Sequence, residues 1–322
     1  MAWNQKALSH VGFEGCLAHQ SGQSSNHQPI LFILSLRSAF QITFASPHDK
    51  SQNASSSRNN KRQKDLHNSR YLPSSLPAFT ILTKLLENNP AVFNALSAKL
   101  GLSLDLEWHD VYSLTEPSLL AMIPCPVLAL LVIMPLTPAW RANRLAEDRD
   151  KPLIYPGKGP QEPVLWFKQT IGEACGSIGL IHCLLNGPAK SHVVGGSWLA
   201  RIKNEAVDLG MDERAKLLYD SHELEVAHQS VAEMGDSKMP SLDGEGHEGQ
   251  HFVAFVKDGG KLWELEGSRR GPLDRGILGE DEDLLCPKAI ELGIGRVIEL
   301  ERASGGGDLR FSCIALAKKI EE

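Results

Sequence analysis

The stretch Gln169-Thr170-Ile171-Gly172-Glu173-Ala174-Cys175-Gly176-Ser177-Ile178-Gly179 carries a cysteine directly before a helical pattern. The apolar residues that make this pattern are Ile178, Ile181, Leu184 and Leu185. We therefore expect a helix that begins near Cys175. Unpaired N–H groups at a helix N-terminus stabilise a thiolate, and the flanking glycines would let a substrate backbone approach closely. A lone cysteine is more often a small buried side chain, so a nucleophilic role requires a base nearby.

The best candidate for that base is His251, which opens the alternating run Phe252–Val256. Alternation of this kind predicts a β-strand. The next four residues, Lys257-Asp258-Gly259-Gly260, are a hairpin signal, and the run 261–266 forms the returning strand. A turn centred between Asp258 and Gly259 places position 251 opposite position 266.

Cross-strand neighbours on one face lie about 5 Å apart, so this hairpin presents the Glu266 carboxylate to the His251 imidazole. Cys175, His251 and Glu266 then have the roles of nucleophile, base and orienting acid in a catalytic triad. Glu264 lies diagonally on the same face and is the competing acid. A surface pair of histidine and glutamate is the alternative interpretation.

A second motif overlaps this strand, because His247-Glu248-Gly249-Gln250-His251 matches the H-E-x-x-H pattern of zinc peptidases. That pattern binds zinc only on a helix, where both imidazoles share one face. Three glycines, at positions 244, 246 and 249, disfavour a helix here. We expect no metal and no cofactor.

The composition limits the class of protein. The 322 residues are 42% hydrophobic and 22% charged, which is typical of a globular chain with one domain and a tail. A net charge of -6 argues against nucleic-acid binding. Six scattered cysteines indicate a reducing compartment, and no apolar run is long enough to cross a bilayer. We expect a cytoplasmic protein; the basic cluster Lys61-Arg62-Gln63-Lys64 leaves nuclear entry as an alternative.

The first part of the chain differs in composition from the rest. Ser, Asn, Gln, His and Lys dominate from about Ser21 to Ser75, and such segments bury too little apolar surface to fold. We expect residues 1–78 to be disordered and residues 79–322 to form the catalytic domain. The domain begins with a helical pattern after Pro90 that ends at Gly101.

Further along the chain, the patterns alternate between strand and helix. The apolar run Val127–Met134 predicts a central strand that is buried on both faces. Helical spacing covers Met211–Ala232, and the Gly- and Ser-rich stretch Gly235–Gln250 predicts a long mobile loop. Residues Leu309–Leu316 predict a last strand. The fold class is mixed α/β.

Several of these segments together resemble the ubiquitin carboxyl-terminal hydrolases, a family of papain-like cysteine deubiquitinases. The resemblance covers nearly all of residues 81–320. The segments that carry it, in the same order as in the family, are Leu86–Phe93, Asp110–Leu114, Leu120–Pro124, Pro135–Thr137, Lys168–His182 and Phe311–Ala317.

The resemblance implies a single α+β domain with a mainly antiparallel central sheet flanked by helices, knotted as in the family. It implies that Cys175 is the nucleophile, His251 the general base and acid, and Gln169 the oxyanion donor. Where the family usually has Glu-Leu-Asp-Gly, this chain has Glu264-Leu265-Glu266-Gly267. A carboxylate is retained with one extra methylene.

The implied activity is hydrolysis of ester, thioester, amide and peptide bonds at the C-terminal glycine of ubiquitin, by a monomer that binds neither nucleic acid nor membrane. The loop at residues 235–250 corresponds to the family's crossover loop over the active site. Two alternatives are a ubiquitin-binding module with weakened catalysis and, less favoured, an H-E-x-x-H zinc peptidase.

Overall fold

A computed structural model describes residues 85–235, 249–305 and 311–321 of the chain, all within one structural unit. The segment 1–78, for which the sequence predicts disorder, lies outside the described residues, as does most of the predicted loop at 235–250. The predicted knot and the boundary of the domain at residue 79 stay predictions.

Within the described residues the chain forms a six-stranded sheet in the order β1-β6-β2-β3-β4-β5, and every pair of neighbours is antiparallel. The strands are β1 Leu106–Asp110, β2 Ala129–Pro135, β3 Gln250–Asp258, β4 Lys261–Leu265, β5 Leu273–Ile277 and β6 Ser312–Lys318. The strand predicted at Val127–Met134 is β2, which lies inside the sheet between β6 and β3. The predictions of a buried central strand and of a mainly antiparallel sheet are confirmed.

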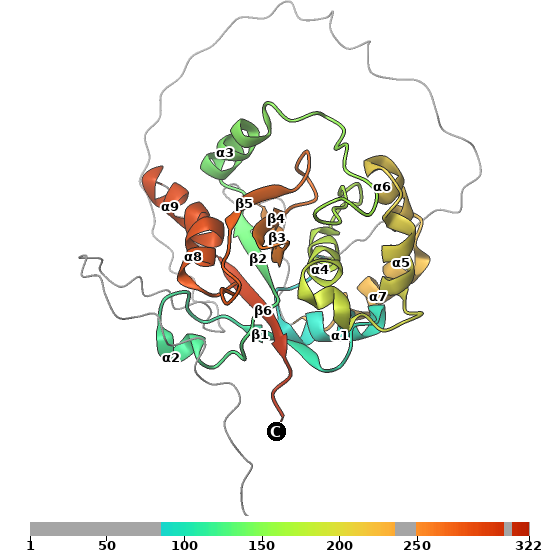
Figure 1. The fold of residues 1–322 in the computed structure, drawn as a ribbon, viewed down its shortest axis with the longest axis horizontal. Helices are drawn as coiled ribbons and strands as arrows, with labels where there is room; N and C mark the ends of the chain where they lie inside the picture. Colours follow the sequence, from blue (N-terminus) through green and yellow to red (C-terminus); the bar gives the residue numbers. More distant parts are fainter. Residues whose placement is uncertain (1–84, 236–248, 306–310, 322) are drawn as a thin grey trace, which may run out of the picture. The chain divides into compact units, whose positions relative to one another are not determined.

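Helices cover both faces of this sheet (Figure 1). The α-helices are α1 Pro90–Leu100, α2 Pro117–Leu120, α3 Pro138–Asp148, α4 Cys175–Leu185, α5 Trp198–Ala206, α6 Met211–Tyr219, α7 His222–Ala232, α8 Pro287–Ile290 and α9 Arg296–Ala303. Two short turns of other helix types are η1 Pro188–His192 and η2 Glu291–Gly295. In the described part of the chain, none of the helices combines the length and apolarity that a membrane span requires.

The alternation of side chains along the strands separates the interior into two cores. On β3, Phe252 and Ala254 pack with α1, α4, α5 and α7 on one face of the sheet. Val253 and Phe255 pack on the other face with α3, α8 and α9. Because both faces are covered, β3 is apolar almost throughout its length.

Residues at the ends of helices explain several boundaries. Helix α1 ends as predicted at Gly101, whose φ of 106° places it in the left-handed region that closes many helices. The helical stretch predicted at 211–232 is two helices, because Ser221 accepts a hydrogen bond from Leu224 N and caps a new helix. The last strand begins at Ser312 and extends two residues beyond the predicted end at Leu316.

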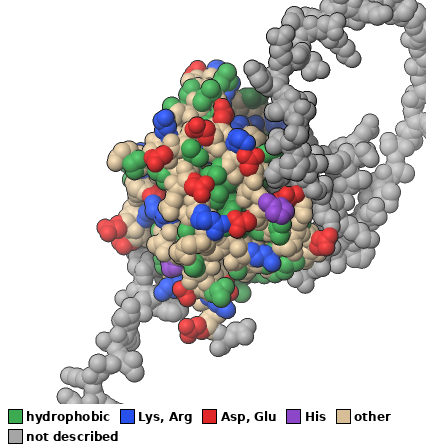
Figure 2. All heavy atoms as spheres, turned by 90° about the vertical axis from the view of Figure 1, so that its right-hand side faces the viewer, with side chains coloured by type: hydrophobic (Ala, Val, Ile, Leu, Met, Phe, Trp, Pro, Cys, Tyr) green, Lys and Arg blue, Asp and Glu red, His purple; other side chains and the backbone are tan. Residues whose placement is uncertain are grey.

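The face formed by α5, α6 and α7 carries acidic and basic side chains side by side (Figure 2). Neither sign of charge gathers into one area on that face of the described residues. A nucleic-acid interface requires a continuous basic surface, which this face does not offer.

Candidate active site

Cys175 is the first residue of helix α4, as the sequence predicts. Its side chain is 5% exposed. The glycines after Cys175 lie against the sheet. A Cβ at Gly179 would lie 2.7 Å from Leu131 Cδ1, and one at Gly176 would lie 3.3 Å from Phe252 Cε2. These two glycines therefore let α4 pack directly on the sheet, while Gly172 has open space beside it.

The hairpin of β3 and β4 differs from its predicted register by two residues. Asp258 pairs with Lys261, so the turn is Gly259-Gly260, and these glycines have φ values of 58° and 72°. A two-residue hairpin turn favours positive φ at both central positions, which two glycines satisfy without strain. The prediction that Glu266 lies directly opposite His251 is wrong, because the observed register, whose last pair is Ala254 with Leu265, places position 268 opposite position 251.

The structure nevertheless brings His251 and Glu266 together. Side chains alternate between the two faces of a sheet, so a shift of two residues keeps Glu266 on the same face as His251. The Nε2 atom of His251 lies 2.7 Å from Oε1 of Glu266. We call residues 266–269, which follow β4, the acid turn. Within it, Ser268 donates both its backbone N–H, at 2.7 Å, and its hydroxyl to the same carboxylate oxygen.

These contacts set the ionisation of the pair. Burial alone lowers the pKa of His251, but hydrogen bonds to the Cys175 and Glu266 side chains and the charges of both outweigh burial and raise it. Burial would raise the pKa of Glu266, but His251, Arg144 and Ser268 outweigh burial and lower it. The pair is therefore an imidazolium and a carboxylate at neutral pH. Since Nε2 of His251 faces Glu266, Nδ1 is the ring nitrogen available to Cys175.

Gln169 lies on the segment 166–169, which leads toward Cys175 and which we call the approach segment. Its side-chain Nε2 donates to Ile171 O at 3.2 Å, while its buried Oε1 has no hydrogen-bond partner among the described residues. Its backbone N–H donates to Gly267 O at 2.8 Å. The approach segment and the acid turn are therefore in direct contact.

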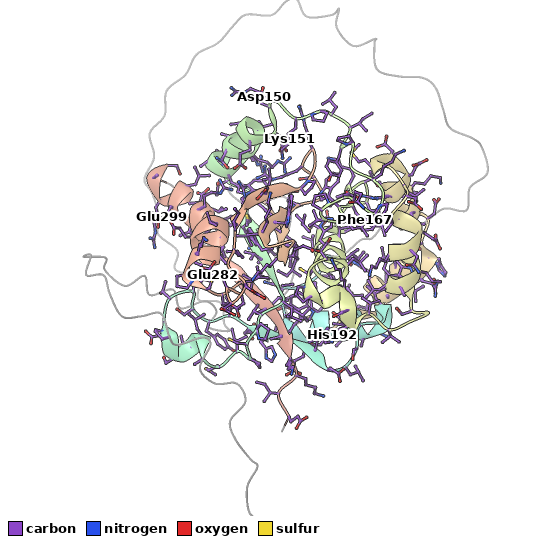
Figure 3. All side chains as sticks on the ribbon, in the orientation of Figure 1. Asp150, Lys151, Phe167, His192, Glu282 and Glu299 are labelled. Carbon is purple, nitrogen blue, oxygen red and sulfur yellow. The ribbon has the colours of Figure 1, made fainter. Side chains whose placement is uncertain are left out.

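The approach segment is also anchored to helix α4. His182 is fully buried in that helix, and its Nε2 accepts a hydrogen bond from Phe167 N at 3.0 Å. Figure 3 labels Phe167 beside α4. Burial lowers the pKa of His182 to about 3, so the ring is neutral in the folded protein.

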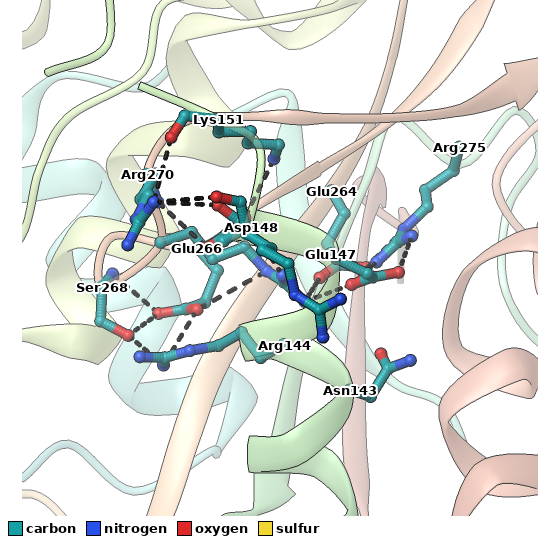
Figure 4. Close-up of polar contacts among 12 residues, drawn as sticks. Asn143, Arg144, Glu147, Asp148, Lys151, Glu264, Glu266, Ser268, Arg270 and Arg275 are labelled. Carbon is teal, nitrogen blue, oxygen red and sulfur yellow. Dashed lines mark hydrogen bonds and ion pairs between the residues drawn. The ribbon is translucent and has the colours of Figure 1, made fainter. Parts of the chain in front are cut away.

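Glu264, the competing acid, contacts arginines instead of His251. Its carboxylate lies 3.1 Å from Nη2 of Arg269 and 2.6 Å from Nη2 of Arg275. Arg269 is 1% exposed and also lies 2.9 Å from Glu147 and 3.8 Å from Glu266. Figure 4 shows this charged cluster between α3, the acid turn and β5. The two glutamates therefore have different main partners. The Glu266 carboxylate contacts His251, and the Glu264 carboxylate contacts Arg269 and Arg275.

Besides Arg269, three contacts of the histidine and its acid were not predicted from the sequence. Arg144 of α3 lies 3.4 Å from Oε2 of Glu266 and over the ring of Trp140. The Trp140 ring in turn lies 6.3 Å from the His251 ring, between centroids. Ser268 supplies the other missed contact. Only Ser268 is close to Glu266 in the sequence; the α3 residues are more than 100 positions away, and no local pattern links them.

The described part of the H-E-x-x-H motif, residues 249–251, is not helical. His251 lies in strand β3, and its Nε2 is taken by Glu266. His247 and Glu248 lie outside the described residues. Over residues 85–235, 249–305 and 311–321, no three His, Cys, Asp or Glu side chains are grouped as metal ligands.

Comparisons with known proteins show which family the chain is similar to. The sequence model of "Ubiquitin carboxyl-terminal hydrolase, family 1" matches residues 84–299. Ubiquitin carboxyl-terminal hydrolase 3 of Arabidopsis thaliana is 34% identical over 236 residues, which cover 73% of this chain and 93% of that protein. The rat isozyme L1 is 32% identical over 235 residues, with 73% and 98% covered.

Solved structures show the same fold. The catalytic domain of Trichinella spiralis UCH37, bound to ubiquitin vinyl methyl ester, superposes with a TM-score of 0.55 at 24% identity. The superposition covers 74% of this chain and 95% of that domain. The extent of the sequence match and the identities show that the chain belongs to ubiquitin carboxyl-terminal hydrolase family 1.

Proposed function

We propose that this chain hydrolyses ester, thioester, amide and peptide bonds at the C-terminal glycine of ubiquitin, with Cys175 as nucleophile. The observation that carries the proposal is the pair of His251 and Glu266, 2.7 Å apart, together with Cys175 at the first position of α4, where it interacts with His251 and raises its pKa. The names of the sequence relatives and the ubiquitin adduct carried by the UCH37 domain support ubiquitin as the partner.

The first half of the reaction forms a thioester. His251, whose pKa is raised, takes up the proton of the Cys175 thiol, and the sulfur becomes the nucleophile. The thiolate attacks the carbonyl carbon of the terminal glycine, and the carbonyl π electrons move to oxygen. When this intermediate collapses, the bond to the leaving group breaks, and His251 gives its proton to the departing nitrogen, oxygen or sulfur atom.

The second half releases ubiquitin. His251, now neutral, takes a proton from a water molecule, and the resulting hydroxide attacks the thioester carbonyl. Collapse of this second intermediate breaks the carbon–sulfur bond and restores the Cys175 thiolate beside the His251 imidazolium. Throughout the cycle Glu266 holds Nε2 of His251 at 2.7 Å, so that Nδ1 stays directed at the sulfur.

We assign the oxyanion to two donors, the side-chain amide of Gln169 and the backbone N–H of Cys175. The Cys175 N–H is available because the first N–H groups of a helix have no partner within it. The Gln169 amide, which donates to Ile171 O at 3.2 Å, would turn from that carbonyl to the oxyanion. Removal of one such donor typically lowers turnover by about 100- to 1,000-fold.

The test is turnover of ubiquitin that carries a fluorogenic amide at its C-terminus. We expect the wild-type chain to release the fluorophore and Cys175→Ala to release none while still binding ubiquitin. Cys183→Ala is the matched control, because Cys183 lies in the same helix and burial raises the pKa of its thiol well above the usual value. Loss of turnover in Cys183→Ala with retention in Cys175→Ala would overturn the assignment.

The location of the protein in the cell is part of the same proposal. Within the described residues the cysteines at 125, 175, 183, 286 and 313 are all free thiols. Free thiols are typical of the reducing cytoplasm, which is where we propose that the protein acts.

A further inference from the structure

The acid turn is bound to the approach segment along its whole length. The indole Nε1 of Trp166 donates to the first carbonyl of the turn, that of Glu266, at 3.2 Å. The backbone N–H of Gln169 donates to the second, at 2.8 Å. The last two carbonyls, those of Ser268 and Arg269, both accept from a single side chain, which belongs to Lys168.

The Lys168 ammonium group therefore links the approach segment to the far end of the turn. Its Nζ lies 2.9 Å from Ser268 O and 2.8 Å from Arg269 O. Hydrogen bonds from a charged donor are about twice as strong as neutral ones. Burial lowers the pKa of Lys168, and the nearby charges of Glu266 and Asp148 act in the opposite direction.

Close packing makes the position of the turn matter to the site. A Cβ at Gly267 would lie 2.8 Å from Gln169 Cβ and 3.2 Å from Ile178 Cγ2, so the backbone of the turn touches both the oxyanion donor and helix α4. A displaced turn cannot slide along this surface without moving Glu266. Because the Glu266 carboxylate sets the position of the His251 ring, such a displacement reaches the reacting atoms.

We propose that Lys168 is a positioning residue for the reaction: its ammonium group fixes the acid turn against the approach segment and thereby holds Glu266 on His251. The inference rests on the proposed function. Lys168 itself is placed on no reacting atom: its two hydrogen bonds go to carbonyls of the turn. Its removal lowers turnover by misplacing the acid and leaves the affinity for ubiquitin largely unchanged.

The experiment compares Lys168→Met, which keeps the length of the side chain but has no donor, with Lys168→Arg, which keeps the charge and several donors. We expect Lys168→Met to lower kcat by about 10- to 100-fold, because a displacement of catalytic groups by about 1 Å can have an effect of this size. KM should stay within about twofold of wild type. Lys168→Arg should restore most of kcat.

A matched control is Lys257→Met. The Lys257 ammonium also donates to backbone carbonyls of a loop, those of Gly279, Glu280 and Glu282. It lies six residues along β3 from His251, a distance of about 20 Å at the rise of a strand. We expect Lys257→Met to lose stability but to keep its kcat per folded molecule. A purely structural role for Lys168 would give the same result in both methionine variants.

A second measurement separates this inference from the proposed function. Alkylation of Cys175 by iodoacetamide, followed by peptide mass mapping, needs no ubiquitin and should be slower in Lys168→Met than in wild type or Lys257→Met. A wild-type protein that does not hydrolyse ubiquitin derivatives would overturn the proposed function, and alkylation would still test Lys168. Unchanged kcat and alkylation in Lys168→Met, or a loss confined to KM, would overturn the inference.

Discussion

The Glu266 carboxylate is surrounded by donors that hold its longer side chain in place. Oxygen Oε1 accepts from His251 and twice from Ser268, while Arg144 and Arg269 lie near Oε2. The extra methylene relative to the aspartate usual in the family is thus accommodated by the acid turn itself. The position of the His251 ring depends on a carboxylate at this length.

Variants of the two glutamates test that dependence. Glu266→Gln should lower turnover by about 10- to 1,000-fold, less than in serine triads because a cysteine thiolate needs less help. Glu266→Asp should be partly active, because its carboxylate retreats by one methylene from His251. Glu264→Gln should turn over almost normally per folded molecule, although it loses stability, because its partners are arginines.

The measurement is turnover of a fluorogenic ubiquitin substrate at a temperature where each variant is folded. If Glu264→Gln proves more damaging to turnover than Glu266→Gln, the assignment of the acid is wrong.

At the scale of single residues, the sequence predicted the contact of His251 with Glu266 and the position of Cys175 at the start of a helix, but not the other contacts of these side chains. The predicted register was wrong by two residues, but a shift of two leaves each side chain on the same face of the sheet, so the predicted contact of His251 with Glu266 still forms. The error came from the turn, since Asp-Gly and Gly-Gly both signal a hairpin and only the second supplies two positions free of a Cβ. Arg144 could not be predicted, because tertiary packing alone brings α3 to the site.

At the scale of elements, helix α4 and the approach segment act as one unit through His182. Because the folded-state pKa of His182, about 3, is depressed below its ordinary 6.5, the unfolded state binds a proton that the folded state does not. Its contribution to stability is therefore present above pH 6.5 and is lost as pH falls toward 3. The slope approaches about 1.4 kcal/mol per pH unit.

His182→Gln removes that slope while keeping an acceptor for Phe167 N–H. We expect the wild type to lose free energy of unfolding more steeply than the variant between pH 6 and about pH 4, as urea unfolding at several pH values would measure. The carboxylates titrate in both proteins, so their effect on the free energy of unfolding cancels in the difference between the two. A difference between the two proteins that stays constant across this range would contradict a neutral buried histidine.

The elements themselves could be predicted where a local signal decides them. Helix α1 ends at Gly101 and β2 follows its apolar run, as expected from capping and burial. The division between α6 and α7 was missed, because the apolar spacing continues across Asp220 and Ser221, and only the Ser221 cap interrupts it. The order of strands, in which β6 lies between β1 and β2, follows from long-range pairing that no local pattern encodes.

At the scale of the whole molecule, the buried charged cluster joins α3, β4, the acid turn, β5 and α9 behind Glu266. Arg269 is its centre, in contact with Glu147, Asp148, Glu264 and Glu266. Removal of one partner from a buried ion pair typically costs about 3 to 5 kcal/mol, because the remaining charges lose their compensation.

Arg269→Met should therefore destabilise the protein by an amount near that range. Arg201→Met is the control, because Arg201 and its partner Glu223 are largely exposed, and such pairs contribute about 0 to 1 kcal/mol. Urea unfolding of both variants gives the comparison. Equal midpoints for the two variants would show that the cluster does not hold these elements together.

The central claim is that Cys175 is the nucleophile that attacks the C-terminal carbonyl of ubiquitin. The most direct test is to incubate the full chain with ubiquitin vinyl methyl ester and to locate the adduct by intact mass and peptide mapping. The account predicts one ubiquitin per chain, bonded to the Cys175 sulfur, present in Cys183→Ala and absent in Cys175→Ala. An adduct retained by Cys175→Ala, or none in wild type while a known hydrolase of the family reacts alongside, would contradict it.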